Sequence, residues 1–221
     1  MVQYGESANR IGSPSLGLGA DVIATVLELL RSAWRAVVRK QEVGPSSTEP
    51  AIAGRLGRHI LAEKKRRGVT TLRVEEEVGT RSSPEAPKAE GRIDIKVIYS
   101  FTEEEYFGIE CKRLGGDRAQ DLAREYITEG VLRFVTGKYS PGHAWCAMVG
   151  FVIDGRVREA VQCVSEQMSK RREAARLNGS CSRETRFGSH DHLYRTVHGQ
   201  TGHSSRLAML HLFLGLGPPT N

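Results

Sequence analysis

The sequence predicts an α/β fold in which helices flank a mixed central β-sheet, with an amphipathic helix near the N-terminus. Two short apolar runs, residues 91–100 and 106–114, are joined by a polar segment that is short enough for a hairpin. A helical pattern over 117–135 then leads to a strongly apolar run of strand length at 144–153. A hairpin followed by a strand–helix–strand crossover is typical of a mixed sheet covered by helices.

Length and composition fit one domain with an appendage. The chain has 221 residues, of which 39% are hydrophobic and 26% are charged, so it can bury a core of its own. We expect an N-terminal arm with the amphipathic helix over residues 1–45 and the main domain over residues 46–217. The net charge of +6 favours encounters with an anionic partner such as a polyphosphate.

The sequence argues against secretion and against membrane insertion. The first twenty residues lack the continuous apolar core of a signal peptide. The longest apolar stretch near the C-terminal end, Leu207 to Leu216, contains His211 and is too short to cross a bilayer. The four cysteines are widely spaced and show no disulfide framework, which favours a reducing compartment. We therefore expect a cytoplasmic protein that makes no membrane contact.

Two helices are expected before the first strand. After a loose Gly- and Ser-rich segment over residues 1–18, apolar residues recur at helical spacing over 21–40. This helix either packs on the main domain or serves as an arm for dimerisation or partner binding. A break at 44–50 precedes the second helix, because Ser and Thr cap helices well and proline suits a first turn. The apolar stripe of this second helix also carries Glu49.

Apolar patterns place the remaining elements. Glu76 lies on the apolar face of the first predicted strand, which makes it a further acidic candidate for a site. The other predictions are a strand at Thr70–Val78, a polar loop at Arg81–Glu90, a helix at Val157–Leu177, and short strands at Leu193–Val197 and Leu207–Leu214.

Charged residues interrupt the two apolar runs of the predicted hairpin. Successive side chains of a strand point to opposite faces, so Asp94 stands opposite the face that Ile93 and Ile95 share. In the second run Phe107, Ile109 and Cys111 share one face, and Glu110 and Lys112 share the opposite one. If the two strands pair, Asp94 and Glu110 converge. Burying such charges is costly unless something compensates, and a bound metal is the obvious compensation.

This arrangement resembles the PD-(D/E)xK superfamily of nucleases, which share the restriction-endonuclease-like fold. The matching residues are Glu49 on the preceding helix, Asp94 in Gly-Arg-Ile-Asp, and the triplet Glu110-Cys111-Lys112 in the next strand, which is followed by a helix. As a text pattern this motif is weak, and its context in two apolar strands strengthens it.

The resemblance implies a Mg²⁺- or Mn²⁺-dependent endonuclease. Asp94 and Glu110 would hold the metal together with the backbone carbonyl of Cys111, and oxygen ligands suit this hard ion. Lys112 would orient or deprotonate the attacking water, and in-line attack would leave a 5′-phosphate. Glu49 would reach the metal directly or through water, or would polarise another ligand.

The likeness covers roughly residues 48–153, with Ile93 where the family usually has proline, a position that varies widely. Residues 126–139 and the following strand are similar to uncharacterised bacterial members found in defence-type gene neighbourhoods. The implied role is DNA cleavage in restriction or antiviral defence, alone or with a partner protein of a defence complex. The sequence leaves a homo-oligomer open.

Two basic segments, residues 55–73 and 170–186, are candidates for contacts with the DNA backbone. A group of loop histidines lacks the spacing of a structural zinc site, although one of them could contact phosphate. The basic candidates are Arg55, Arg58, Lys64, Lys65, Arg66, Arg67, Lys170, Arg171 and Arg172, and the histidines are His190, His192, His198 and His203.

Three alternatives to an active nuclease stay open. Glu110 and Lys112 could form a water-facing pair on an edge strand, which alternating strands often display. The chain could be a nucleic-acid-binding or assembly subunit that keeps the fold without cleavage. It could also be a nuclease that is silent until a partner docks on the 21–40 helix.

Overall fold

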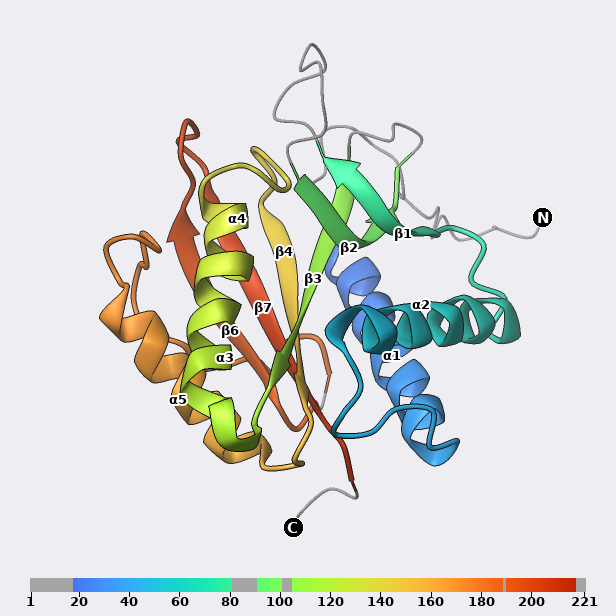
Figure 1. Cartoon of the computed structure of the whole chain (residues 1–221). Coiled ribbons are helices and arrows are strands. Elements are labelled where there is room, and N and C mark those ends of the chain that lie inside the picture. The colour runs from blue at the N-terminus through green and yellow to red at the C-terminus, as the bar shows by residue number, and fades with distance from the viewer. Residues whose placement is uncertain (1–17, 81–90, 101–104, 189, 218–221) are drawn as a thin grey trace, which may run out of the picture.

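Seven strands form one open mixed sheet that lies between two layers of helices (Figure 1). The computed structural model describes residues 18–80, 91–100, 105–188 and 190–217. The expectations for residues 1–17, for the loop at 81–90 and for the hairpin turn at 101–104 lie outside these ranges.

The order of elements confirms the α/β expectation. The helices are α1 (Ala20–Arg39), α2 (Glu49–Arg66), α3 (Ala119–Tyr126), α4 (Leu132–Val135) and α5 (Val157–Lys170), with a 3₁₀ turn η1 (Gly116–Arg118) and a π-helical turn η2 (Ile127–Val131). The strands are β1 (Arg73–Thr80), β2 (Gly91–Ile98), β3 (Tyr106–Leu114), β4 (Trp145–Val152), β5 (Ser182–Arg183), β6 (Leu193–Gly199) and β7 (Arg206–Gly215).

The sheet combines two hairpins with a parallel centre. Its strand order is β1-β2-β3-β4-β7-β6-β5. The pairs β3–β4 and β4–β7 are parallel, whereas the pairs on both outer sides are antiparallel. Parallel strands need a crossover, and the α3–α4 segment supplies it between β3 and β4. β3 and β4 are buried along nearly their whole length, as expected for strands covered on both faces.

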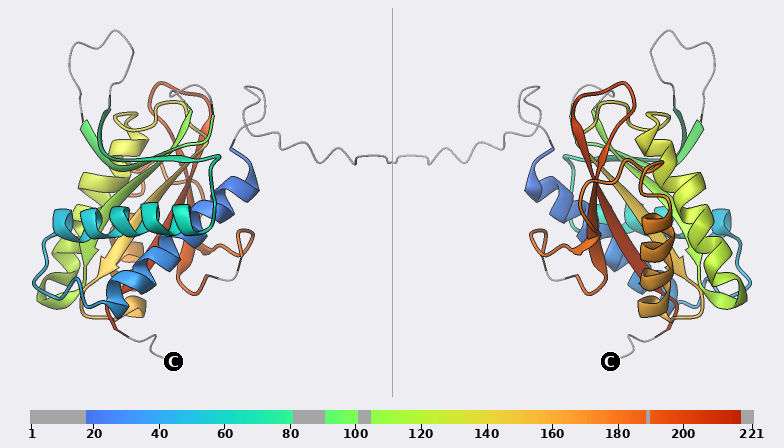
Figure 2. Two further views of the ribbon diagram at one scale, coloured as in Figure 1. Left: turned by 90° about the vertical axis from the view of Figure 1, so that its right-hand side faces the viewer. Right: turned by 90° about the vertical axis from the view of Figure 1, so that its left-hand side faces the viewer.

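Helices α1 and α2 cross on one face of the sheet, and α3, α4 and α5 cover the other (Figure 2). The apolar side of α1 is buried from Val22 to Val37 against the sheet. Trp34 fixes the helix there, because its ring stacks on Phe151 at a centroid distance of 5.3 Å and its Nε1 donates to the Gly215 carbonyl at 2.9 Å. Of the two roles weighed for this helix, packing on the main domain is the one observed. None of the described helices has the length and hydropathy needed to span a membrane.

Two predictions of local structure are wrong. The helix expected to reach Leu177 ends at Lys170, because the chain then turns and buried Leu177 bridges to His198 beside β6. Ile93 does not share a face with Ile95, since Ile93 packs in the core under α3–α5 and Ile95 in the core under α1 and α2. The alternation fails at the intervening aspartate, next to the strand β1 residue Glu77, whose φ is 50°.

Candidate active site

The candidate site lies where strands β2 and β3 separate. Their backbone pairing runs from Ile98 and Tyr106 to Ile95 and Ile109. Beyond that point, backbone N–H groups of β3 donate to carboxylates instead of to carbonyls of β2. A buried backbone N–H must find another acceptor when its ladder ends. Two acidic side chains supply such acceptors for β3.

Asp94 and Glu49 are these two acceptors. Asp94 Oδ2 accepts a hydrogen bond from the backbone N–H of Cys111 at 2.6 Å. Glu49 Oε2 accepts one from the backbone N–H of Arg113 at 2.9 Å. Glu49 is the first residue of α2, where a negative charge is favoured by the helix dipole. Asp94 lies close enough to Glu110 for its charge to raise the pKa of that acid, as expected if the two acids converge, and Glu49 joins them from the helix through Lys112.

Lys112 lies at the centre of these acids. Its Nζ donates to Glu49 Oε1 at 2.7 Å, to Glu110 Oε1 at 3.0 Å and to the Cys111 carbonyl at 3.0 Å. Burial alone would lower the pKa of Lys112, but the charges of Glu110 and Glu49 outweigh it and raise the pKa above its usual value. The side chain is therefore an ammonium group with all three of its protons engaged.

Glu110 is the most buried acid of the site, with 2% of its surface exposed. Its Oε1 accepts from Lys112, whereas its Oε2 is buried and has no hydrogen-bond partner among the described residues. Burial, with a contribution from the charge of Asp94, raises the pKa of Glu110 to about 8. Burial also raises the pKa of Asp94, against the opposing effect of the Cys111 N–H. A buried carboxylate oxygen without a donor is rare and calls for an explanation.

Arg133 and Tyr139 complete the site, and the sequence pattern identified neither as a site residue. Arg133 Nη1 lies 3.4 Å from Glu110 Oε1 and donates to Tyr139 Oη at 2.7 Å, while Nη2 donates to Glu129 at 3.0 Å. Tyr139 Oη in turn donates to the Arg92 carbonyl at 2.5 Å, two residues before Asp94 in strand β2. This network links α4 to the split between the strands.

A π-helical turn brings Arg133 to Glu110. The turn η2 contains Gly130, in the middle of the segment for which the sequence predicts a helix. A side chain at Gly130 would overlap with Met148 Cε, and Lys112 Cγ lies 3.7 Å from the position of its Cβ. Glycine thus lets the helix approach β3 and β4 closely, and π turns of this kind often occur at functional sites. The mid-helix glycine was the one sequence signal that could have drawn attention to this segment.

Glu76 lies apart from the site. Its carboxylate occupies the space above Gly57 of α2, where any side chain would overlap with it. Burial raises its pKa, and the charge of Arg58 opposes that shift. The sequence offered Glu49 and Glu76 as acids in addition to Asp94 and Glu110. In the structure Glu49 contacts Lys112, whereas Glu76 lies against α2.

The predicted basic residues fall in opposite helix layers (Figure 1). On α2, Arg66 and Arg67 contact Glu63, while Arg58 and Lys65 are exposed. Arg172, just after α5, donates to the Gly179 carbonyl. The remaining predicted members lie on the same two segments: Arg55 and Lys64 on α2, and Lys170 and Arg171 at the end of α5.

The histidines are dispersed. His198 is fully buried, with Nε2 bonded to Thr196 Oγ1 at 2.6 Å and Nδ1 to the Ala175 carbonyl at 2.7 Å. His203 lies beside Gly142, at the far end of the sheet's β6–β7 hairpin. His190 and His192 line a separate pocket next to α1.

The donor set fits a hard divalent cation. Asp94, Glu110 and the Cys111 carbonyl offer only oxygen ligands, and Glu110 Oε2 is a buried acceptor that lacks a donor. In the arrangement described, Lys112 engages Glu110 and Glu49, and no group of three or more His, Cys, Asp or Glu side chains in the described ranges is already arranged around a metal position. Binding would therefore require Lys112 to give up at least one of these bonds.

No protein-family model matches the chain, and neither a curated protein nor a solved structure matches it.

Proposed function

We propose that the chain is a metal-dependent endonuclease that hydrolyses DNA phosphodiester bonds, with the restriction-endonuclease-like fold of the PD-(D/E)xK superfamily. One observation carries the proposal. At the split between β2 and β3, Lys112 donates to both Glu49 and Glu110, and Asp94 is held beside them by the Cys111 N–H. The buried Oε2 of Glu110 has no donor among the described residues. A cation that binds there in place of the proton favoured by the raised pKa of Glu110 would satisfy this oxygen.

Asp94, Glu110 and the Cys111 carbonyl would hold Mg²⁺ or Mn²⁺. When bound, the cation would neutralise charge on the phosphate and lower the pKa of water. Asp94 is held in place by the Cys111 N–H, so its position does not depend on the ion. Glu49 is held in the same way by the Arg113 N–H.

Lys112 suits the role of a donor better than that of a base. Its raised pKa keeps it protonated at neutral pH, so it cannot accept a proton from water in this arrangement. An ammonium group released from Glu110 would be free to donate to a phosphate oxygen as negative charge develops there. Arg133, at 3.4 Å from Glu110 Oε1, adds a second positive charge that the sequence did not suggest.

A second candidate function is favoured by the bonds of Lys112. Because its ammonium is fully engaged by Glu49, Glu110 and the Cys111 carbonyl, the chain would be inactive until another component shifts these contacts. Such a subunit would bind DNA or assemble with a defence complex. The apolar side of α1 is already buried on the sheet, so this partner would need another surface.

The test is a cleavage assay with purified full-length protein and single- and double-stranded DNA and RNA. Each substrate is incubated with Mg²⁺, Mn²⁺ or a chelator. We expect DNA cleavage that requires the cation and that Asp94→Ala and Lys112→Ala abolish. Glu76→Gln is the matched control, because this acid lies apart from the site and its removal should leave cleavage unchanged.

Two outcomes would redirect the proposal. Cleavage that persists in both alanine variants would show that the activity does not come from this site. Binding of DNA without cleavage under every condition would favour the second candidate function.

A further inference from the structure

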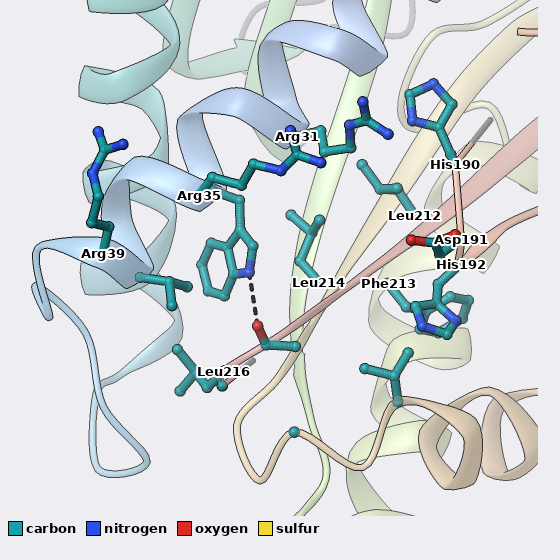
Figure 3. Close-up of a pocket in the computed structure, with 16 residues that line it drawn as sticks. Arg31, Arg35, Arg39, His190, Asp191, His192, Leu212, Phe213, Leu214 and Leu216 are labelled. Carbon is teal, nitrogen blue, oxygen red and sulfur yellow. Dashed lines mark hydrogen bonds between the residues drawn. The ribbon is translucent and has the colours of Figure 1, made fainter. Parts of the chain in front are cut away.

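A pocket of about 480 Å³ lies on the other side of α1 from the site's helix α2, between α1, the end of β7 and the segment before β6 (Figure 3). None of the residues Glu49, Asp94, Glu110 or Lys112 lines it. Its volume is within the range of about 300–1,000 Å³ that is usual for small-molecule sites.

One wall of the pocket is cationic. Arg31, Arg35 and Arg39 follow one another at four-residue spacing along α1, so they lie on the same side of the helix (Figure 3). Arg31 is paired with Glu28 at 3.2 Å. Arg35 and Arg39 are exposed and make no ion pair with any described residue. These two guanidinium groups are thus available to bind an anion, which they can hold bidentately.

The opposite wall offers hydrogen-bond acceptors. His190 is 5% exposed, and its Nε2 bonds to the Phe187 carbonyl at 3.1 Å. A carbonyl can only accept, so Nε2 carries the proton and Nδ1 of the neutral ring is an acceptor. That Nδ1 is buried and has no partner among the described residues. Asp191 lies beside it on the same wall and adds a carboxylate (Figure 3).

The floor between the two walls is apolar. It consists of the side chains of Trp34, Val38, Leu212, Leu214 and Leu216. The Trp34 indole N–H is already bonded to Gly215, so this residue contributes ring surface rather than a donor. A ligand for such a pocket needs three parts: an anionic group, an apolar or aromatic body, and a hydroxyl or N–H donor at the far end.

We infer that this pocket binds an organic anion of mononucleotide size. Its phosphate or carboxylate lies against Arg35 and Arg39, and its hydroxyl or N–H donors satisfy His190 Nδ1 and Asp191. A nucleoside monophosphate has all three parts. An alkyl phosphate has the anion and the apolar body but lacks the donor, and inorganic phosphate has the anion without the body.

Calorimetric titration of the full-length protein at low salt tests the inference with adenosine 5′-monophosphate, octyl phosphate and inorganic phosphate as probes. We expect adenosine 5′-monophosphate to bind most tightly and inorganic phosphate at least about tenfold more weakly. Arg35→Ala combined with Arg39→Ala should weaken binding of the nucleotide at least about tenfold, because the double variant cannot form the charge-assisted hydrogen bonds to the phosphate. Both residues are exposed, so the fold should be kept.

The matched control is Arg118→Ala combined with Arg124→Ala, which removes the same charge from exposed positions around α3 and should leave affinity unchanged. His190→Ala should weaken binding of the nucleotide but not of octyl phosphate. Equal losses in the two arginine double variants would overturn the inference, as would the absence of binding for all three probes. Tighter binding of octyl phosphate than of the nucleotide would overturn the assignment of a donor-bearing ligand. The experiment measures no cleavage, so its failure would leave the proposed nuclease function untouched.

Discussion

At the scale of single residues, the ionisation of Glu110 governs the site. Its pKa is raised from 4.5 to about 8 by burial and by Asp94, so the folded state holds a proton that the unfolded chain releases. The contribution of Glu110 to stability is therefore greatest below pH 4.5 and is lost as the pH rises to about 8. Glu110→Gln removes this titration. The free energy of unfolding of the variant, relative to that of the wild type, should rise by about 2 kcal/mol or more as the pH goes from 5 to 9. A shift of one pKa unit corresponds to about 1.4 kcal/mol.

Denaturant unfolding at several pH values measures this difference, and Mg²⁺ provides a second readout. A cation that binds only the folded state should stabilise the wild type at pH 9 and leave the Glu110→Gln variant unaffected. Glu76→Gln is the control for the Mg²⁺ readout, because its carboxylate lies apart from the site. A difference in stability between the wild type and Glu110→Gln that stays constant from pH 5 to pH 8 would contradict the raised pKa of Glu110.

Arg133 provides a second prediction at this scale. Its guanidinium contacts Glu110, Tyr139 and Glu129, so replacing it by Gln removes a positive charge beside the buried carboxylates. We expect Arg133→Gln to lower the rate of DNA cleavage about 10- to 100-fold while the thermal midpoint changes little, and Arg133→Lys to restore part of the rate. Single-turnover kinetics with saturating metal distinguishes this from weaker DNA binding. A normal rate in Arg133→Gln would exclude Arg133 from the site's chemistry.

At the scale of elements, the separation of β2 from β3 explains what could be predicted and what could not. The alternation of Phe107, Ile109 and Cys111 against Glu110 and Lys112 depends only on the local strand period, and it is confirmed. The face of Ile93 was predicted wrongly because the alternation fails where Asp94 leaves the ladder to accept the Cys111 N–H. The hydrogen bond from Cys111 to Asp94 joins two strands, so the pattern of residues within one strand cannot predict it. Glu49 was found because it continues the apolar stripe of its helix, which the local helical period shows.

The π turn at Gly130 is the element that the periodicity could not show, and it can be tested by substitution. Gly130→Ala places a methyl group where Met148 Cε lies, so it should cost about 1–3 kcal/mol of unfolding free energy and shift Arg133 away from Glu110. Met148→Leu shortens the opposing side chain and should restore part of that stability in the double variant. Gly54→Ala is the control, because open space surrounds that helical glycine and alanine is the better helix former. Equal stability of Gly130→Ala and the wild type would contradict the close packing.

At the scale of the whole molecule, the two basic segments lie on opposite faces of the sheet, one on α2 and one at the end of α5 (Figure 2). One straight DNA duplex cannot lie against both faces at once. Glu49 begins α2, and the cluster Lys64, Lys65 and Arg66 ends it. A helix of 18 residues is roughly 27 Å long at about 1.5 Å per residue. The site and the α2 cluster are thus separated by about the length of 8 base pairs of duplex DNA, at about 3.4 Å per pair.

This separation predicts how DNA binding responds to salt and to duplex length. Lys64→Ala combined with Lys65→Ala should weaken binding and reduce the slope of log affinity against log salt concentration by about 1 for each phosphate that the variant no longer neutralises. Duplexes shorter than about 8 base pairs should show the reduced slope even with the wild type, because they cannot reach both ends of α2. Lys170→Ala combined with Arg172→Ala is the control on the opposite face and should leave the slope unchanged. Fluorescence anisotropy over a salt series measures all three. A slope that falls in the α5 variant and not in the α2 variant would place the duplex on the other face of the sheet and would separate DNA binding from the acids at the start of α2.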